Sequence, residues 1–200
     1  MNKPGVFIIE SLTFEDEQKE RFEGRFLSHI LKLGGIETEY YYLRTKSELK
    51  EVLNIFYDSQ YGNLHISCHG NKDFLATTLD NISHEEFGKL TEVYLHKKRL
   101  FLSACSATNR SLAEKVIPKS ECYSVIGPSS DIEFNDAAII WAAFYHLIFK
   151  ANVGSMKRSD ILPILETLVK TFDVEMNYYS VSKKRKSGIL GTIIRNKNAE

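Results

Sequence analysis

The sequence predicts a three-layer α/β/α sandwich built on a mainly parallel central sheet. Short apolar runs of strand length alternate with longer segments whose apolar residues recur at helical spacing. Such alternation is typical of repeated strand–helix–strand units, in which helices cover both faces of a parallel sheet. No linker, internal repeat or low-complexity stretch divides the 200 residues, so we expect a single domain over 1–200.

The first strand–helix unit occupies the N-terminal part of the chain. The apolar run 6–9 predicts a buried strand, and Thr13 is placed to cap the helix that follows. The first turn of that helix is acidic, as the helix dipole favours, with Glu15, Asp16 and Glu17. The helix is expected to end at Gly34–Gly35. The residues expected on its buried face are Phe22, Phe26, Ile30 and Leu33.

The later elements follow the same alternation. Further strands are expected at 38–43, 64–68, 100–104 and 123–126. The helices between and after them are expected to begin at Ser47, at a Ser83–Glu86 capping box, near Ser111, after Asn135 and after Ser159. The helix near Ser111 is expected to end before Pro118. The last two apolar runs, 176–181 and 189–194, form a hairpin or join the sheet edge.

Composition narrows the class of function. Basic and acidic residues both number 26, so the chain has no general field that would gather nucleic acid. Its basic cluster, Lys183–Lys186, is expected to be an exposed turn, with a nucleic-acid or anionic-lipid contact as the alternative. An odd number of cysteines without an export signal favours the reducing cytoplasm. The longest apolar run, 137–149, is too short to cross a bilayer, so no membrane contact is expected.

Two chemically reactive residues follow successive predicted strands. His69, itself followed by Gly70, comes after the strand 64–68, and Cys105 comes after the strand 100–104. The two residues lie 36 positions apart, which is enough for one crossover helix, so the two strands can be parallel neighbours about 4.8 Å apart. A lone histidine or a lone buried cysteine is usually structural. Their joint placement at one edge of the sheet predicts a catalytic pair.

Such a pair has a clear chemical use. A free thiol is only slightly ionised at neutral pH, and an adjacent imidazole can take its proton and later protonate a leaving amine. A tetrahedral intermediate also needs donors for its oxyanion. We expect the backbone N–H of Gly70 to be one donor, because a residue without Cβ lets its N–H approach a substrate closely. The N–H of Cys105 is the expected second donor.

At these residues the sequence resembles the caspase-like (clan CD) cysteine peptidases, in particular the CHAT family related to separase. The matching stretches are Leu64-His-Ile-Ser-Cys-His-Gly70 and Leu100-Phe-Leu-Ser-Ala-Cys105, and the resemblance extends over about residues 63–149. It implies a dyad of His69 and Cys105, a sheet of about six strands between helices, and neither metal nor cofactor. It also implies a protein substrate, a separate regulatory or adaptor protein, and a bacterial signalling or defence pathway such as antiviral defence.

The chain departs from the caspase pattern around the cysteine. Caspases carry Gln-Ala-Cys and a glycine two residues later. Here Ser103 precedes Ala104, and Ala107 occupies the later position, so specificity for aspartate is not expected. The acidic loop after the strand 123–126 suggests instead a preference for cleavage after Arg or Lys, since carboxylates pair well with guanidinium groups. The residues expected to bind the substrate are Asp131, Glu133 and Asp136, with solvent exposure and helix capping as the alternative.

Three other residues near the pair have structural interpretations. Cys68 and Cys122 are expected in the core. His65 shares the strand parity of His69, so it either orients that ring or packs beneath the sheet.

The main rival function is a catalytically silent interaction module with the same fold. A nucleotide-binding domain is disfavoured, because neither Gly-x-Gly-x-x-Gly nor Gly-x-x-x-x-Gly-Lys-Ser/Thr is present.

Overall fold

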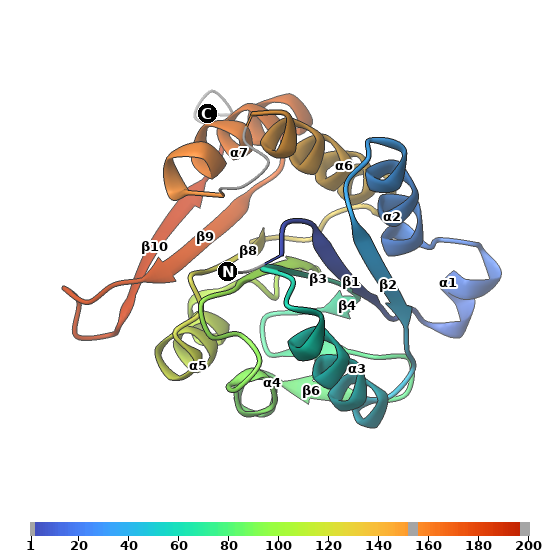
Figure 1. Ribbon diagram of the computed structural model, residues 1–200, viewed down its shortest axis with the longest axis horizontal. Helices are drawn as coiled ribbons and strands as arrows, with labels where there is room; N and C mark the ends of the chain where they lie inside the picture. Colours follow the sequence, from blue (N-terminus) through green and yellow to red (C-terminus); the bar gives the residue numbers. More distant parts are fainter. Residues whose placement is uncertain (1–2, 152–155, 197–200) are drawn as a thin grey trace.

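In the computed structural model, which describes residues 3–151 and 156–196, seven strands form one central sheet (Figure 1). Five neighbouring strands are parallel, in the order β2 (Thr38–Tyr42), β1 (Val6–Glu10), β3 (Asn63–Ser67), β7 (Arg99–Ser103) and β8 (Ser124–Pro128). An antiparallel hairpin of β9 (Met176–Val181) and β10 (Ile189–Ile194) continues the sheet beyond β8. The last two runs therefore form a hairpin and also join the sheet edge.

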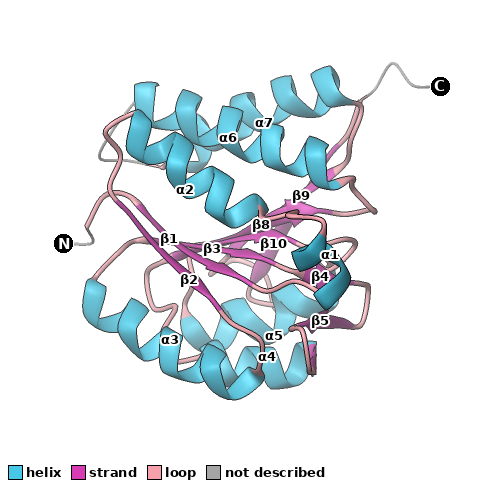
Figure 2. Ribbon diagram, turned by 90° about the vertical axis from the view of Figure 1, so that its right-hand side faces the viewer, coloured by secondary structure: helices cyan, strands magenta, loops and turns pink. Residues whose placement is uncertain are grey.

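Helices cover both faces of the sheet, which confirms the predicted three-layer sandwich (Figure 2). One layer contains α2 (Glu23–Leu33), α6 (Phe134–Ala151) and α7 (Arg158–Phe172). The opposite layer contains α3 (Lys46–Ser59), α4 (His84–Thr91) and α5 (Arg110–Ser120). At the carboxyl edge of the parallel strands lie the short helix α1 (Phe14–Gln18) and a small antiparallel sheet of β4 (His69–Gly70), β5 (Phe74–Ala76) and β6 (Asn81–Ser83).

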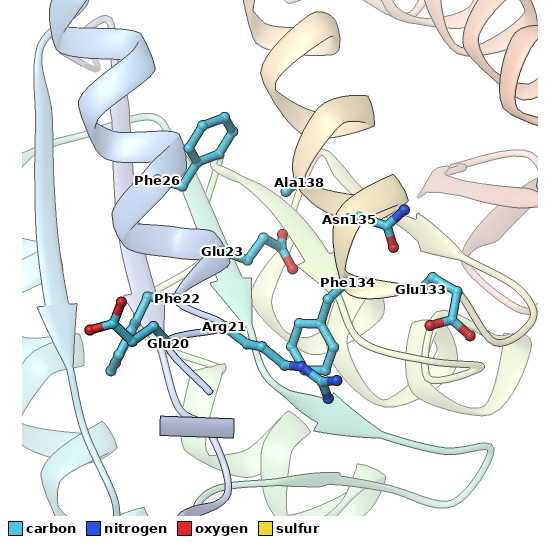
Figure 3. Close-up of a pocket in the computed structure, with 9 residues that line it drawn as sticks. All are labelled: Glu20, Arg21, Phe22, Glu23, Phe26, Glu133, Phe134, Asn135 and Ala138. Atoms are coloured by element: carbon cyan, nitrogen blue, oxygen red, sulfur yellow. The ribbon is translucent and has the colours of Figure 1, made fainter. Parts of the chain in front are cut away.

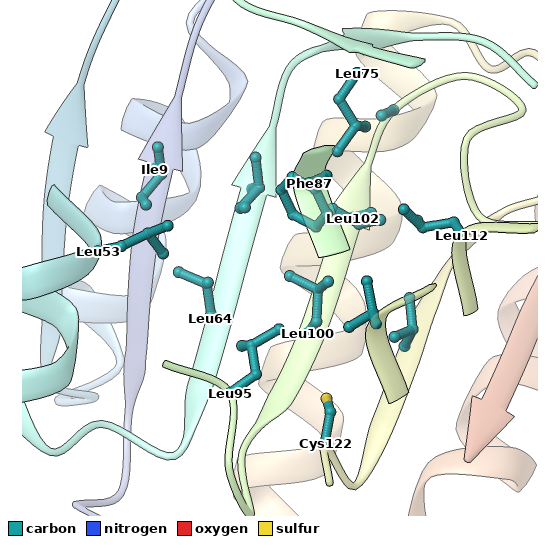
Figure 4. Packing of buried hydrophobic residues seen from close by; sticks show 14 of the residues in the cluster. Ile9, Leu53, Leu64, Leu75, Phe87, Leu95, Leu100, Leu102, Leu112 and Cys122 are labelled. Atoms are coloured by element: carbon teal, nitrogen blue, oxygen red, sulfur yellow. The ribbon is translucent and has the colours of Figure 1, made fainter. Parts of the chain in front are cut away.

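Each face of the sheet has its own hydrophobic core. The core under α3, α4 and α5 is mostly aliphatic, and Figure 4 shows Leu64, Leu100 and Leu102 of neighbouring strands packed within it. Cys122 is fully buried in this core, as expected. The core under α2, α6 and α7 is rich in aromatic rings, with Trp141 in contact with both Phe101 and Phe144. Because the side chains of a strand alternate between faces, β1, β7 and β8 supply residues to both cores.

Local sequence signals explain most helix starts. Ser83 and Glu86 form the predicted capping box at the start of α4. A second capping box, of Thr45 and Glu48, starts α3 slightly earlier than Ser47. Thr13 caps α1 by accepting a hydrogen bond from the Asp16 N–H.

The expected first helix is in fact two helices, and its predicted buried face was wrong. Phe26 and Leu33 are 44% and 86% exposed, whereas Glu23 and Gly24 are buried. The reason is a close contact with the end of β1. The Gly24 N–H donates to Glu10 Oε1 at 2.6 Å, and a Cβ at Gly24 would lie 3.1 Å from the Glu10 Cβ. Glycine therefore fixes which side of α2 approaches the sheet.

Three predicted helix boundaries also differ from the structure. α6 begins at Phe134, so Asn135 lies inside it, and Ala137 N–H already donates to Glu133 O. α5 continues through Pro118 to Ser120, whose hydroxyl donates to Val116 O near the end of the helix. α7 begins at Arg158, which places Ser159 in its first turn.

Candidate active site

The register of the parallel strands brings the predicted pair to one edge. Ser67 at the end of β3 lies opposite Ser103 at the end of β7, and the Cys68 N–H donates to Ser103 O at 3.0 Å. His69 and Cys105 each follow two residues later, so they leave the sheet at equivalent positions. The expectation that two neighbouring strands deliver both side chains to one rim agrees with this geometry.

His69 and Cys105 line the same cavity, of about 60 Å³. Glu23 of α2 and Phe134 of α6 complete its walls on the helical side. The Cys105 thiol donates a hydrogen bond to the Ile132 carbonyl oxygen over 3.6 Å. Among the residues that the structure describes, no hydrogen bond joins Cys105 Sγ to the His69 ring.

The backbone around Cys105 is tightly constrained. Ser106 has a φ of 54°, in the left-handed region that non-glycine residues seldom adopt. Its N–H donates to Ser130 O, and its hydroxyl donates to Asp131 Oδ1. On the other side, a Cβ at Gly70 would lie 3.2 Å from Ala104 Cβ and 3.1 Å from Ala107 Cβ. Glycine at 70 therefore allows the segment after His69 to approach the turn that carries Cys105.

An acidic residue that the sequence analysis assigned only to a helix dipole contacts the histidine. Asp16 Oδ2 lies 2.7 Å from His69 Nε2, and Arg21 donates to Asp16 Oδ1 at 2.9 Å. Burial acts to raise the pKa of Asp16, but hydrogen bonds from Thr13, His69 and Arg21 outweigh it and hold the pKa below its usual value. Only the tertiary fold links Asp16 to His69, because 53 positions separate them in the sequence.

A buried polar network lies beneath the cavity. Glu23 Oε2 accepts hydrogen bonds from the Ser67 and Ser103 hydroxyl groups, at 3.1 and 2.9 Å. Glu23 Oε1 is buried without a hydrogen-bond partner and lies 3.8 Å from His65 Nε2, which also lacks one. His65 is fully buried, and its Nδ1 lies 3.1 Å from the Tyr145 hydroxyl group. Of the two interpretations of His65, packing beneath the sheet is therefore correct, and the residue that contacts His69 is Asp16.

A larger pocket of about 350 Å³ adjoins the first and shares Glu23 and Phe134 with it. It lies between α2 and α6, and Figure 3 shows Glu23 pointing into it, with Arg21 alongside the Phe134 ring. Its walls are apolar at Phe22, Phe26 and Ala138, and Glu133 stands at its rim. A long side chain with a polar end would fit this combination.

The three acidic residues predicted to bind the substrate do not converge. Glu133 is exposed and lines the larger pocket. Asp131 is exposed and accepts the Ser106 hydrogen bond, and Asp136 lies in the first turn of α6, where it accepts from Asn135. Glu23 is the acidic residue that the sequence analysis missed, since it sits at the start of a helix whose buried face was assigned differently.

The other cysteines differ from Cys105 in their surroundings. Burial raises the pKa of both Cys68 and Cys122 to about 12, so neither thiol is ionised near neutral pH. All three cysteines are free. Within residues 3–151 and 156–196, no group of three His, Cys, Asp or Glu side chains is arranged to hold a metal ion. Nor does any helix in those ranges have the length and apolar character needed to cross a membrane.

The sequence matches no protein-family model and no curated protein. In structure, the chain is similar to a secreted C11 cysteine protease from Bacteroides thetaiotaomicron, called iotapain, with a TM-score of 0.61 and 10% sequence identity. The likeness covers 90% of this chain and 66% of that protease, so the chain spans slightly less than two thirds of its neighbour's length. The chain therefore shares its caspase-like α/β fold with this cysteine protease.

Proposed function

We propose that the chain is a cysteine endopeptidase that hydrolyses peptide bonds in protein substrates with His69 and Cys105. One observation carries the proposal: the two side chains line one cavity at the carboxyl ends of paired parallel strands. Functional sites in open α/β sheets form at this edge. The fold is also that of a known cysteine protease, which supports the same chemistry.

In this proposal the thiol proton passes from Cys105 to His69 as the sulfur attacks the substrate carbonyl carbon. A carbon–sulfur bond forms, and the carbonyl oxygen takes the negative charge. His69 then returns the proton to the amide nitrogen, the carbon–nitrogen bond breaks, and the amine leaves. His69 then takes a proton from a water molecule as the water oxygen attacks the thioester carbon. A carbon–oxygen bond forms, the carbon–sulfur bond breaks, and His69 returns the proton to the sulfur, which restores the thiol. The N–H groups of Gly70 and Cys105 are the proposed donors to the oxyanion.

Cleavage after Arg or Lys is the proposed specificity. Glu133 at the rim of the larger pocket supports it, and so does Glu23, whose buried Oε1 lacks a hydrogen-bond partner. A guanidinium group would donate a hydrogen bond to that oxygen and would also balance the negative charge of the Glu23 carboxylate. Asp131 and Asp136 remain in the proposal as parts of the loop that borders the site. A peptide library cleaved without any preference for a basic residue before the scissile bond would rule this specificity out.

The activity itself can be tested with a peptidyl acyloxymethyl ketone carrying lysine at the reactive end. We expect covalent labelling of Cys105, located by peptide mass spectrometry, in the native chain. Cys105→Ala should abolish the label and His69→Ala should reduce it strongly. Cys68→Ala is the matched control. Cys68 is partly buried in the same cavity, but the raised pKa of its thiol keeps it un-ionised, so its loss should leave the labelling unchanged. Labelling that persists at full rate in His69→Ala would contradict the dyad.

A catalytically silent interaction module is the second candidate. The hydrogen bond from the Cys105 thiol to Ile132 O favours it, since this contact occupies the thiol proton. In that case the probe would not label Cys105 in the folded native chain, whether or not a mild reductant is added. The chain would then act through a surface rather than through its thiol.

The biological setting stays a proposal drawn from the resemblance to the CHAT family. It comprises a cytoplasmic location, a separate regulatory or adaptor protein, and a role in bacterial signalling or antiviral defence. It includes no nucleic-acid or membrane partner.

A further inference from the structure

The short helix α1 reaches across the carboxyl edge of the sheet and contacts the proposed catalytic histidine. Its residue Asp16 is 5% exposed, and both of its carboxylate oxygens are engaged. Oδ2 contacts His69 Nε2 at 2.7 Å and accepts from the Thr13 hydroxyl at 2.6 Å, while Oδ1 accepts from Arg21. A carboxylate held from several sides cannot turn away from the ring, so the contact with His69 has a fixed direction.

The ring of His69 is also constrained from the helical layer. Phe134 meets it edge-on, with ring centroids 5.5 Å apart, and the Arg21 guanidinium lies 5.4 Å from the centre of the Phe134 ring. Arg21 thus links the two groups that border His69, because it binds Asp16 and lies against Phe134. The histidine is nevertheless 39% exposed, so it stays accessible to a substrate.

The direction of the contact decides which ring nitrogen can act. A carboxylate facing Nε2 favours the tautomer with hydrogen on Nε2, which leaves the Nδ1 lone pair to accept a proton. The same carboxylate stabilises the imidazolium that forms when His69 accepts that proton. Resting on the proposed peptidase function, we propose that Asp16 is a positioning residue, which holds His69 with Nδ1 free to exchange a proton with Cys105.

A purely structural interpretation predicts something different. In that case the Asp16–His69 contact only holds α1 against β4, and losing any other contact that holds α1 in place would affect the reactivity of Cys105 to the same extent. The chain offers such a contact in the same helix. Glu17 binds Arg44 through two hydrogen bonds of 2.9 and 2.6 Å and accepts from the Tyr42 hydroxyl group, without contacting His69. Glu17→Gln therefore loosens α1 and leaves the histidine contact in place.

Other ionisable groups near the ring must be considered in any pH measurement. Asp16 and Arg21 lie on its α1 side, Glu23 belongs to α2, and Cys68 and Cys105 follow the neighbouring strands. The pKa of Cys68 is raised to about 12 by burial, and that of Asp16 is held below its usual value. Neither group changes its charge between pH 6 and pH 9, about the range in which a thiol–imidazole pair titrates.

The experiment measures the rate at which iodoacetamide alkylates Cys105 between pH 6 and pH 9, located by peptide mass spectrometry. The variants are Asp16→Asn, His69→Ala, the double variant and Glu17→Gln. Alkylation reports the thiolate directly and needs no peptide substrate. We expect Asp16→Asn to slow alkylation at pH 7 about tenfold and to move the midpoint of the pH profile upward by about one unit. Glu17→Gln should match the native chain.

The double variant separates the two interpretations further. If Asp16 acts through His69, the double variant reacts at the rate of His69→Ala alone. Two results would overturn the role of Asp16. One is a double variant whose alkylation rate falls by the product of the two single effects, and the other is a rate loss in Glu17→Gln as large as that in Asp16→Asn. A native rate equal to that of His69→Ala would instead reject the dyad itself. The failure of the proposed function is therefore distinguishable from the failure of this inference.

Discussion

Two adjacent rows of residues cross the central sheet, and they differ completely in chemistry. Ile9, Ile66 and Leu102 lie side by side on β1, β3 and β7, and all three face the aliphatic core. One position later, Glu10, Ser67 and Ser103 form a row that faces the opposite layer of helices. The members of both rows are almost completely buried. Because both rows are equally buried, they differ only in the chemical type of their side chains and in the groups that these side chains contact.

The apolar row stabilises the fold, and the polar row builds the floor of the site. Ser67 and Ser103 hold Glu23, while Glu10 accepts hydrogen bonds from the N–H groups of Gly24 and Arg25 and so fixes the start of α2. Buried polar groups cost free energy unless they are paired. Here the three polar residues of the row pair with groups at the start of α2. This pairing fixes the position of the helix residues that line the cavity.

The largest effect on stability is expected from a substitution in the apolar row. Leu102 is fully buried, so Leu102→Ala should lower the free energy of unfolding by about 2–5 kcal/mol, from lost burial and the cavity left behind. Urea unfolding monitored by circular dichroism measures it. A loss below about 1 kcal/mol would mean that this row does not carry the stability assigned to it.

A second prediction concerns the charge of the polar row. Burial raises the pKa of Glu10 to about 7, although hydrogen bonds from Tyr40 and Gly24 oppose the shift. The folded state thus keeps a proton that the unfolded state releases above its own lower pKa. The protonated Glu10 side chain therefore contributes to the free energy of unfolding at low pH. This contribution, about 3 kcal/mol in total, is lost as the pH rises from the ordinary glutamate pKa of 4.5 to about 7.

Glu10→Gln should remove this pH dependence, because the amide does not titrate. The measurement compares the free energy of unfolding at pH 5 and pH 8 in both chains. We expect the native chain to lose more stability between the two pH values than the variant does. Equal losses would show that Glu10 is already ionised at pH 5 in the folded state.

Ser103→Ala sharpens the comparison with its neighbour Leu102. The change removes one of the two hydroxyl donors to Glu23 Oε2 and leaves a buried acceptor less well paired. We expect a loss of about 1–2 kcal/mol in the free energy of unfolding. Ser103→Cys is a useful companion variant, since it keeps similar volume with a weaker donor. A loss as large as that of Leu102→Ala would erase the distinction between the rows.

The smallest effect is expected at the site itself. Cys105 is half-buried and makes one long hydrogen bond, so Cys105→Ala should change the free energy of unfolding by less than about 1 kcal/mol. Cys122→Ala is the matched comparison, because Cys122 is fully buried in the aliphatic core and its loss should cost more. If the order of the two variants were reversed, Cys105 would be a structural residue.

Sequence patterns predicted the sandwich, the strand order around the site and the placement of His69 and Cys105. These predictions succeed because they rest on short-range periodicity and on the rule that consecutive strands of α/β units are often neighbours. The face of α2 was predicted wrongly because its apolar residues Phe26 and Leu33 are exposed, while Glu23 and Gly24 face the sheet. The buried face of α2 is mixed, because it also contains Leu27, Ser28 and Leu31, and hydrophobic periodicity alone does not reveal the polar part of such a face.

The sequence by itself determined the alternation of strands and helices, the caps of several helices and the positions of a histidine and a cysteine after two strands. Each of these depends on residues close together in the chain. Only the tertiary structure decided that Asp16 contacts His69 and that Glu23 lies under the cavity. Those contacts join α1 and α2 to strands 44 to 80 positions away, so they arise from packing across the sheet edge and leave no local signal.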